Sequence, residues 1–360
     1  MDALTPEKLI AIADAAVKAP SADNCHVFRL QVEKNRIAVI GTPAFLEAPP
    51  HRRLLGLISL GAMVANLEIR SKSIGLALIP EWRIEEGCSS ETLCLLEWRP
   101  SGSEFDPLDA AIDTRQTNRA LRFRGPRLAD EARRELSREC DAQPDTKLFW
   151  FDKPERRKRA LRLVRIAETE RFRRQPLHEE LFGSIRFDVD WATPVEEGLP
   201  PGSLSLPTFE RGPFRMLRHW RIQRLMNGAL GAHHFIGLRA AYLPCRLTPH
   251  LCAIGTGIKG DMGAIHVGRA LQRVWLRAAL RGMALQVFAA PALYAVAEVP
   301  GVSSSVRSTL RIGWTDLCPD SPPLIVFRLG WAPLPSVRAG RPPAETIIAR
   351  TASASRPGAK

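Results

Sequence analysis

The chain has 360 residues, 45% of them hydrophobic, which is enough for a sizeable core in two domains or in one large two-lobed body. Its formal net charge of +13 comes mainly from arginine, so nucleic acid is a partner to consider. Because the arginines are spread along the whole chain and aromatic residues are not interleaved with them, we expect no nucleic-acid partner.

The N-terminal residues 1–9 carry charges and contain no apolar signal core, which predicts a cytoplasmic protein. The most apolar stretch, residues 54–69, is interrupted by Asn66 and Glu68 and is followed at once by Arg70. A segment so short and so charged at one end is typical of a buried helix and not of a membrane span. We therefore expect no membrane partner.

The seven cysteines are an odd number, are scattered along the chain and form no C-x-x-C pair. This spacing argues against both a disulfide framework and a structural zinc site. We expect most of these cysteines to be small buried hydrophobic residues, and we expect no metal site.

Thr5 and Pro6 are typical of a helix start, and Pro20 would end that helix. The turn-forming residues that follow include Ser21 and Asn24. Alternating patterns over residues 27–32 and 36–40 then predict two strands. Ser21 and Asn24 should therefore lie on a loop between a helix and a strand, where local capping and turn formation are sufficient to explain them.

A long apolar helix is predicted for about residues 52–73, and it has a twin. Gly61, Arg70 and Gly75 recur 207 residues later as Gly268, Arg277 and Gly282. Each copy is followed by a strand-like run, over residues 93–100 and 324–333. Weak identity at one near-constant spacing predicts a duplicated unit, as if two chains of a dimer were fused.

The pattern between and after the two copies is less regular. We divide the chain into a first half (1–105), a second half (106–345) and a disordered tail (346–360). Residues 175–215 match nothing in the first half, are rich in Pro, Gly and aromatics, and are interpreted as a lid-like insertion. Around this insertion we predict helices at 129–140, 154–174 and 216–235, and strands at 146–151 and 251–255.

The stretch of residues 113–119 contains two arginines four positions apart, with a hydroxyl residue between them. If it is helical, Arg115 and Arg119 lie on one face and can both reach one anion, while Thr117 adds a short donor. The spacing is compatible with a phosphate site, but in a chain this rich in arginine such a pair is more often part of a solvated helix face, which the pattern alone favours.

Two of these motifs resemble a known family. Residues 19–24 (Ala-Pro-Ser-Ala-Asp-Asn) are similar to the A-P-S-x-x-N loop of the FMN-dependent nitroreductase superfamily, although His26 and the next two residues replace its usual Gln-Pro-Trp. Residues 115–119 resemble its R-x-S-x-R/K phosphate motif, with Thr117 for Ser. The twin helices resemble the central dimer helix of this family. Residues 330–333 (Gly-Trp-Ala-Pro) resemble its C-terminal end. The resemblance covers most of residues 5–345.

Ordinary members of this superfamily are homodimers with two flavins at the interface. A single chain with two halves resembles the fused, pseudo-dimeric branch, which includes bacterial dormancy-associated flavin-sequestering proteins and also resembles oxidases of pyrrole pigment biosynthesis. The resemblance implies an α+β fold, with two mixed or antiparallel sheets flanked by helices around paired central helices. It also implies a protein that is monomeric, because the usual dimer surface lies within the chain.

The motifs of the two halves make one site rather than two. The first half has the Ser21/Asn24 loop, but residues 1–18 contain no arginine. The second half has Arg115 and Arg119 but no recognisable A-P-S-x-x-N loop. We therefore predict one FMN per chain, with the insertion covering either the complete site or the vacant one.

The resemblance implies a role for each residue of the complete site. Arg115 and Thr117, together with Arg338 or Arg341, would hold the FMN phosphate, and Arg119 would lie beside the N1/C2 edge of the flavin as a catalytic cation. Ser21 and Asn24 would contact the ring or the ribityl chain. Backbone amides around the flavin N5 would come from Phe288, Ala289 and Ala290.

Proton transfer needs a further group, and His26 is the nearest candidate, although it can equally be a satisfied loop histidine. The implied function is hydride transfer through flavin N5 to or from a small aromatic or heteroaromatic molecule, with NAD(P)H as a candidate electron donor. A dehydrogenase whose own substrate reduces the flavin stays open. The alternative class is an FMN-binding or sequestering protein with little or no turnover, and a nucleic-acid binder explained by charge alone is a third.

Overall fold

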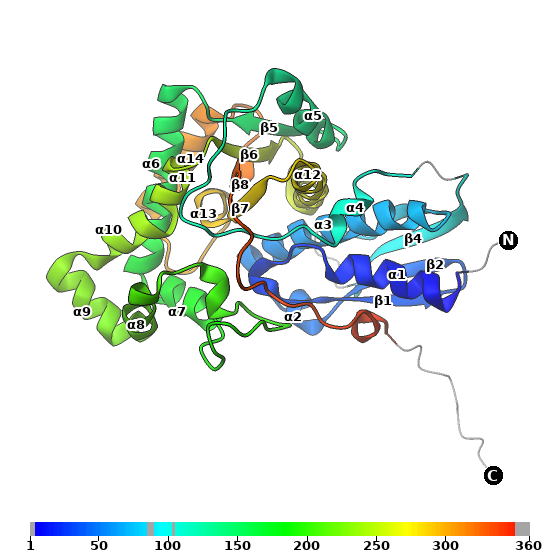
Figure 1. Ribbon diagram of the computed structural model, residues 1–360, viewed down its shortest axis with the longest axis horizontal. Helices are drawn as coiled ribbons and strands as arrows, with labels where there is room; N and C mark the ends of the chain where they lie inside the picture. The colour runs from blue at the N-terminus through cyan, green and yellow to red at the C-terminus, as the bar shows by residue number, and fades with distance from the viewer. Residues whose placement is uncertain (1–3, 85–89, 103–104, 350–360) are drawn as a thin grey trace, which may run out of the picture.

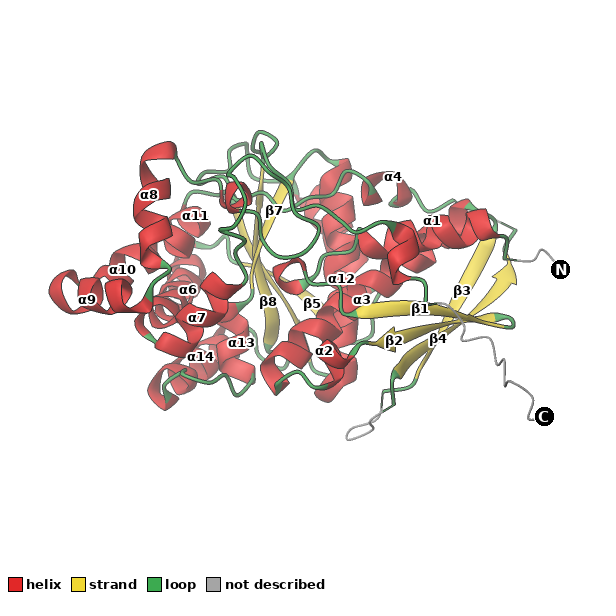
Figure 2. Cartoon of the chain, turned by 90° about the horizontal axis from the view of Figure 1, so that it is seen from below, coloured by secondary structure: helices red, strands yellow, loops and turns green. Residues whose placement is uncertain are grey.

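The computed structural model describes residues 4–84, 90–102 and 105–349. The chain is an α+β protein with two four-stranded antiparallel sheets and helices packed around two long central helices, α3 (Pro50–Ser73) and α12 (Gly260–Leu280) (Figure 1). Figure 2 shows this helix pair between the two sheets. The expected α+β class and the paired central helices are confirmed.

The first half contains one sheet with the strand order β1-β2-β4-β3. Its strands are β1 (Phe28–Glu33), β2 (Arg36–Gly41), β3 (Leu76–Trp82) and β4 (Thr92–Pro100). Besides α3, its helices are α1 (Pro6–Val17), the short turn η1 (Ala22–Asn24) and α2 (Pro43–Leu46).

The second half contains the other sheet, with the order β5-β6-β8-β7. Its strands are β5 (Thr146–Trp150), β6 (His250–Thr256), β7 (Ala284–Phe288) and β8 (Pro323–Gly330). Besides α12, its helices in chain order are α4 (Asp109–Ile112), α5 (Asp130–Asp141), α13 (Ala290–Val296), α14 (Ser304–Leu317) and the turn η4 (Ala344–Ile347).

The two sheets repeat one topology. In both, the first strand lies at one edge and pairs with the second, the third strand lies at the other edge, and the fourth lies between the second and the third. Each second strand carries a register shift against its fourth strand, at Val39/Ile40 in the first sheet and at Ile254/Gly255 in the second. The edge strands β3 and β7 are additions to the elements predicted from the sequence.

The first helix begins as predicted. Pro6 occupies its first turn, and the Thr5 hydroxyl accepts a hydrogen bond from the Lys8 backbone amide (3.4 Å). This cap satisfies one of the amides that the first turn leaves without a helical partner. Ile12, Ala13 and Val17 are buried against the first core.

The central helices cross where the duplicated glycines lie. A side chain added at Gly61 would overlap the Ile265 carbonyl oxygen, and one added at Gly268 would overlap the Ile58 carbonyl oxygen. Ile58 and Ile265 are themselves separated by the same 207 residues as the glycines. The two backbones therefore touch symmetrically, which only a residue without a Cβ allows.

A large insertion distinguishes the second half. In the first half, Lys34 and Asn35 are all that separates β1 from β2, whereas residues 151–249 separate β5 from β6. The insertion is thus wider than the predicted 175–215, because the flanking helices also lack a counterpart. It contains α6 (Pro154–Arg173), α7 (Gln175–Gly183), η2 (Pro201–Leu204), α8 (Thr208–Leu217), α9 (Trp220–Leu230), α10 (Ala232–Gly237), the π-turn η3 (Leu238–Tyr242) and α11 (Leu243–Arg246).

The first residues of the predicted disordered tail, 346–349, are ordered. Ile347 is buried in the first core, Ile348 forms a parallel bridge with Leu30, and the Ala349 amide donates to the Leu30 carbonyl (2.7 Å). The apolar residues Ile347 and Ile348 lie beside the open edge of β1, and these contacts are enough to order the segment. Residues 350–360 lie outside the described part of the chain.

The helix α3 is long and apolar enough to cross a membrane by length and composition. However, 78% of its most apolar window is buried inside the protein. Its apolar residues pack against α1, α12 and the first sheet, so it is a core helix, as predicted.

The helix crossing leads to a stability prediction. Gly268→Ala should lower the free energy of unfolding by about 1–3 kcal/mol, because the new methyl group meets backbone that cannot rotate away. Gly228→Ala is the matched control: Gly228 lies in α9 with open space around it, so alanine should be neutral or stabilise by up to about 1 kcal/mol. Chemical denaturation measures both, and equal stabilities would contradict a close backbone crossing.

Candidate functional site

A cavity of about 630 Å³ lies where the two halves and the insertion meet. Its volume is in the range of small-molecule and cofactor sites. The wall combines the 20–23 loop and α3 of the first half, residues 117–119, α12 and β7 of the second half, and helices α6, α7, α8 and α10 of the insertion. One composite site is therefore built from segments far apart in the sequence.

The first half contributes one face of α3. Arg52, Leu55, Ser59 and Ala62 line the cavity at helical spacing. The Ser59 hydroxyl accepts a hydrogen bond from the Ala22 amide (3.3 Å), which ties the preceding loop to this helix. The helix thus positions the loop that carries Ser21.

The Arg115–Arg119 segment is extended rather than helical, so the predicted helical face is wrong. Thr117 forms a parallel bridge with Leu285 of β7, and the Asn118 amide donates to the Leu285 carbonyl (3.0 Å). Pairing with a strand edge supplies the backbone partners that a helix would otherwise provide. In an extended chain alternate residues share a side, so Arg115, Thr117 and Arg119 still lie on one side of the backbone.

The floor of the cavity comes from β7 and α12. Val287, Phe288 and Ala289 line it at the end of β7, and Leu271 and Trp275 line it from successive turns of α12. Trp275 is also in contact with Arg115, whose guanidinium lies 4.5 Å from the centre of the indole ring. This contact fixes both side chains.

Three arginines lie beside this cavity, of which Arg115 is buried and Arg119 and Arg341 are half-buried. Arg115 is only 7% exposed and donates to the Lys18 carbonyl (2.7 Å). Arg119 lines the cavity, and its nearest acceptor is the Ser203 carbonyl at 3.5 Å. Arg341 donates to the Asn24 side-chain oxygen (2.5 Å) and to the Gly340 carbonyl (2.7 Å).

None of these three guanidinium groups has a carboxylate oxygen within 4.0 Å among the described residues. Burial lowers the pKa of Arg115 to about 9, with the positive charge of Arg341 adding to the effect, and burial lowers the pKa of Arg341 to about 10. Burial also lowers the pKa of Arg119. Arg115 and Arg341 are therefore still cationic at neutral pH. Because buried charges are normally paired, this cluster is suited to an anionic ligand.

Other charges on the cavity wall are compensated. Arg52 forms an ion pair with Asp23 (2.5 Å) and a second one with Glu180. Arg239 pairs with Glu210 at 3.0 Å. The contrast singles out Arg119 as a cationic wall residue with no carboxylate partner in the described structure.

Two buried polar atoms near the cluster also have no hydrogen-bond partner in the described structure. They are the Ser21 hydroxyl oxygen, which lies on the cavity wall, and the Arg115 Nε. A buried polar atom without a partner costs about 1–3 kcal/mol, so both are expected to bond to a ligand or to water.

Asn24 is placed differently from the prediction. It does not line the cavity. Its side-chain nitrogen donates to carbonyls of the insertion loop, Glu196 (3.0 Å) and Gly198 (3.2 Å), while its oxygen accepts from Arg341. With both ends of the amide engaged, Asn24 orients Arg341 and anchors the insertion rather than contacting a ligand.

His26 also lies away from the cavity, in a small pocket that includes Val17, Phe28 and Met63. Burial lowers the pKa of His26 to about 4, and the positive charge of Arg341 contributes. The imidazole is therefore neutral at pH 7, and it does not line the cavity, although the small pocket shares Ser21 and Ser59 with the cavity wall. The predicted proton-transfer function of His26 has no geometric support.

The remaining predicted residues divide in the same way. Phe288 and Ala289 line the cavity, whereas Ala290 is buried behind it at the start of α13. Arg338 is exposed and does not line the cavity. Of the two C-terminal arginines, Arg341 is the half-buried one, because the preceding turn directs it back toward Asn24.

Several wall residues escaped the sequence analysis. Trp275, Ser59 and Arg52 lie on the paired helices, where the sequence indicated only a buried core. The signal that could have found them is a difference between the two copies of the repeat. At the 207-residue offset, Trp275 corresponds to Glu68 and Arg269 corresponds to Ala62. Positions at which the two copies of a repeat carry different residues indicate where the copies differ in function.

The equivalent position on the other side of the helix pair is filled. Where the cavity has Ala62 and Trp275, that side has Arg269 and Glu68, and their side chains form an ion pair at 2.9 Å. Burial raises the pKa of Glu68, although Arg269 opposes this shift. A bulky, mutually satisfied pair occupies the space that the first site leaves open.

The unpaired arginines predict an unusual stability response. In ligand-free protein, Arg115→Met should change the free energy of unfolding by less than about 1 kcal/mol, because it removes a buried cation without stranding a carboxylate. Arg70→Met is the matched control. It leaves Asp109, which Arg70 contacts at 2.6 Å, without its partner and should cost about 1–3 kcal/mol. Urea denaturation compares the two, and a larger loss for Arg115→Met would identify it as a structural contact.

The His26 environment predicts a pH effect. Between pH 6.5 and about 4 the unfolded chain binds a proton that folded His26 does not, so stability falls as the pH is lowered through this window. His26→Gln should reduce this loss by up to about 1 kcal/mol at pH 5. The exposed His219→Gln is the control, and an unchanged pH profile in His26→Gln would show that the imidazole is protonated in the folded state.

No protein-family model matches the chain, and no curated protein matches it. Solved structures that resemble it include the FMN-dependent nitroreductase NfnB from Mycobacterium smegmatis in complex with NADPH (17% identity, 62% of this chain and 86% of that chain, TM-score 0.34). A nitroreductase-like family protein from Bacillus cereus is 11% identical, with 69% of this chain and 98% of that chain covered and a TM-score of 0.35. A BluB-like flavoprotein from Clostridium difficile is 11% identical, with 68% of this chain and 99% of that chain covered and a TM-score of 0.37. At these TM-scores the overlap is partial, and no property of the neighbours transfers to this chain.

Proposed function

We propose that the chain binds one FMN in the composite cavity and is a flavin oxidoreductase of the nitroreductase type. The observation that carries this proposal is a cluster of the buried Arg115 and the half-buried Arg119 and Arg341 beside a cavity of about 630 Å³. None of the three has a carboxylate partner among the described residues. A phosphate monoester supplies the missing negative charge, and fork-shaped guanidinium groups suit it.

The residues present fit this cofactor. The Ser21 hydroxyl and the Arg115 Nε have no other partner, and Thr117 adds a hydroxyl on the cavity wall between the two arginines. Phe288, Ala289 and Trp275 provide an apolar surface against which a planar ring system can pack. Ser21 and Arg119 come from different halves, as the resemblance to the nitroreductase superfamily implies.

When bound, FMN supplies a centre that accepts or donates a hydride. The chain's own contribution is electrostatic: Arg119 is a half-buried cation held at the cavity wall, and a fixed positive charge in an apolar site stabilises negative charge developing on a bound group. Phe172, Phe209 and Phe214 line the insertion side of the cavity. Their rings favour a small aromatic or heteroaromatic substrate, and we further propose NAD(P)H as the electron donor.

The proposal of a single FMN per monomer has a structural basis. The equivalent position across the helix pair holds the Arg269–Glu68 ion pair, which a ligand would have to separate. Breaking a buried pair is strongly unfavourable.

We also propose that the protein acts in the cytoplasm.

A second candidate function is sequestration of FMN without turnover. It is favoured by the insertion, because helices α6, α7, α8 and α10 all line the cavity and Asn24 ties the insertion to the phosphate side of the site. Flavin that dissociates over hours, together with no turnover on nitroaromatic or quinone acceptors, would favour storage. Bleaching of the bound flavin by NADPH or NADH under anaerobic conditions would favour the reductase.

The FMN site predicts a defined stoichiometry and charge dependence. Titration of flavin-free protein should saturate at one equivalent, and Arg119→Glu should weaken FMN binding by at least about 100-fold, because it replaces a cation of the cavity wall by a negative charge that repels an anionic cofactor. The exposed Arg338→Glu should bind as the wild type does. Fluorescence quenching of FMN measures both. Saturation at two equivalents, or a fully yellow Arg119→Glu protein, would refute this placement.

A further inference from the structure

We propose that the α8–α9 segment of the insertion docks on an anionic membrane surface. Residues 208–230 contain five arginines and a single acidic residue, Glu210. They also expose large apolar side chains, including Phe209 (78% exposed), Met216 (58%) and Leu225 (70%). This combination of exposed apolar residues and arginine is typical of helices that lie in a lipid interface.

The exposed apolar residues of α8 form a stripe. Phe209, Pro213 and Met216 are spaced four and three residues apart and are all exposed. The stripe also reaches the cavity, because Phe209 and Pro213 line it together with Phe214 and Leu217. Arg211, Arg215 and Arg218 lie on the other side of α8. The helix is therefore amphipathic, and its apolar side stays exposed at Phe209, Pro213 and Met216.

Of the arginines around this stripe, Arg211 lies over the Trp191 ring and Arg215 donates to the Phe187 carbonyl, whereas Arg221 and Arg224 are exposed. Arg211, Arg215, Arg218, Arg221 and Arg224 form no ion pair within the described residues. Arg221 and Arg224 lie with Leu225 on the exposed side of α9. Each arginine close to an anionic bilayer contributes about 1 kcal/mol of attraction, so the set complements such a surface.

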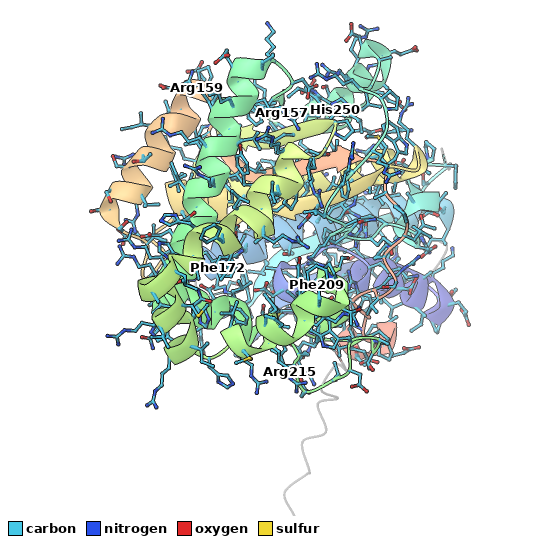
Figure 3. All side chains as sticks on the ribbon, turned by 60° about the vertical axis from the view of Figure 1, so that its left-hand side comes forward. Arg157, Arg159, Phe172, Phe209, Arg215 and His250 are labelled. Atoms are coloured by element: carbon cyan, nitrogen blue, oxygen red, sulfur yellow. The ribbon has the colours of Figure 1, made fainter. Side chains whose placement is uncertain are left out.

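The cavity opens at the same place. Phe209 and Phe235 line the cavity and yet are 78% and 70% exposed, so they stand at its mouth. The Arg239–Glu210 ion pair joins η3 to α8 beside them. Figure 3 shows Phe209 and Arg215 on α8, at the end of the insertion away from Arg157 and Arg159 of α6. A membrane against α8 would therefore cover the mouth.

A bilayer fits this surface better than two other partners. Nucleic acid would use the arginines but would leave the apolar stripe in water. A second copy of the chain would bring a second cluster of arginines against the first, which is unfavourable. An anionic bilayer uses both features, because lipid headgroups meet the arginines and the acyl region receives the apolar side chains. This inference departs from the expectation of no membrane partner, which considered only spanning segments.

Docking at the mouth also bears on the substrate. A ligand that enters between Phe209 and Phe235 would come from the bilayer, so the favoured substrates are lipid-soluble aromatic molecules rather than freely soluble ones. This consequence rests on the proposed oxidoreductase function. The docking itself does not, and a binding assay without substrate keeps the two separate.

The test is co-sedimentation of the full chain with vesicles of phosphatidylglycerol and phosphatidylcholine, compared with vesicles of phosphatidylcholine alone. We expect binding to the anionic vesicles that weakens as salt is raised. Phe209→Ser/Met216→Ser and, separately, Arg221→Glu/Arg224→Glu should each reduce the bound fraction at least tenfold. Because α9 does not line the cavity, the α9 double variant should retain its FMN content, which reports on folding and on the cofactor site independently.

Matched controls lie elsewhere on the surface. Ile312→Ser replaces a 60% exposed apolar residue on α14, which Figure 2 shows apart from α8, and Arg338→Glu reverses an exposed arginine outside the segment. Both should bind vesicles as the wild type does. The proposal is overturned by wild-type protein that stays in solution, by equal binding to neutral vesicles, by controls as weak as the segment variants, by preferential binding to duplex DNA, or by self-association that Phe209→Ser/Met216→Ser abolishes.

Discussion

The close crossing of α3 and α12 is the contact on which the site depends. Gly61 and Gly268 let each backbone touch the other helix at an isoleucine carbonyl, so the two halves meet without intervening side chains. Because the helices are this close, Ser59 and Ala62 of one face the same cavity as Leu271 and Trp275 of the other. The crossing therefore decides which loop of the first half meets which segment of the second.

The repeat is symmetric in its backbone but not in its chemistry. Both halves share one strand order, yet only one side of the helix pair carries a cavity with unpaired cations. On the other side Arg269 and Glu68 satisfy each other. An ion pair neutralises the guanidinium on that side, whereas Arg115, Arg119 and Arg341 beside the cavity have no carboxylate partner among the described residues.

The insertion between β5 and β6 connects the site to the exterior. On its inner side it contributes cavity wall and, through Asn24, holds the segment that carries Arg341. On its outer side it carries five arginines without carboxylate partners among the described residues, and exposed apolar side chains beside the cavity mouth. Segments added to a duplicated scaffold are free to vary because the core does not depend on them, so specificity is expected to reside here.

The sequence by itself determined the duplicated central helices, most strand positions and the identity of Ser21, Thr117 and Arg119 as wall residues, because periodicity and short motifs are local properties. It could not determine the conformation of residues 115–119, which are extended because β7 offers partners from 285 onward. Nor could it separate half-buried Arg341 from exposed Arg338, or show that Asn24 and His26 point away from the cavity. Only the tertiary structure decided these, because burial and pairing depend on which distant segments meet.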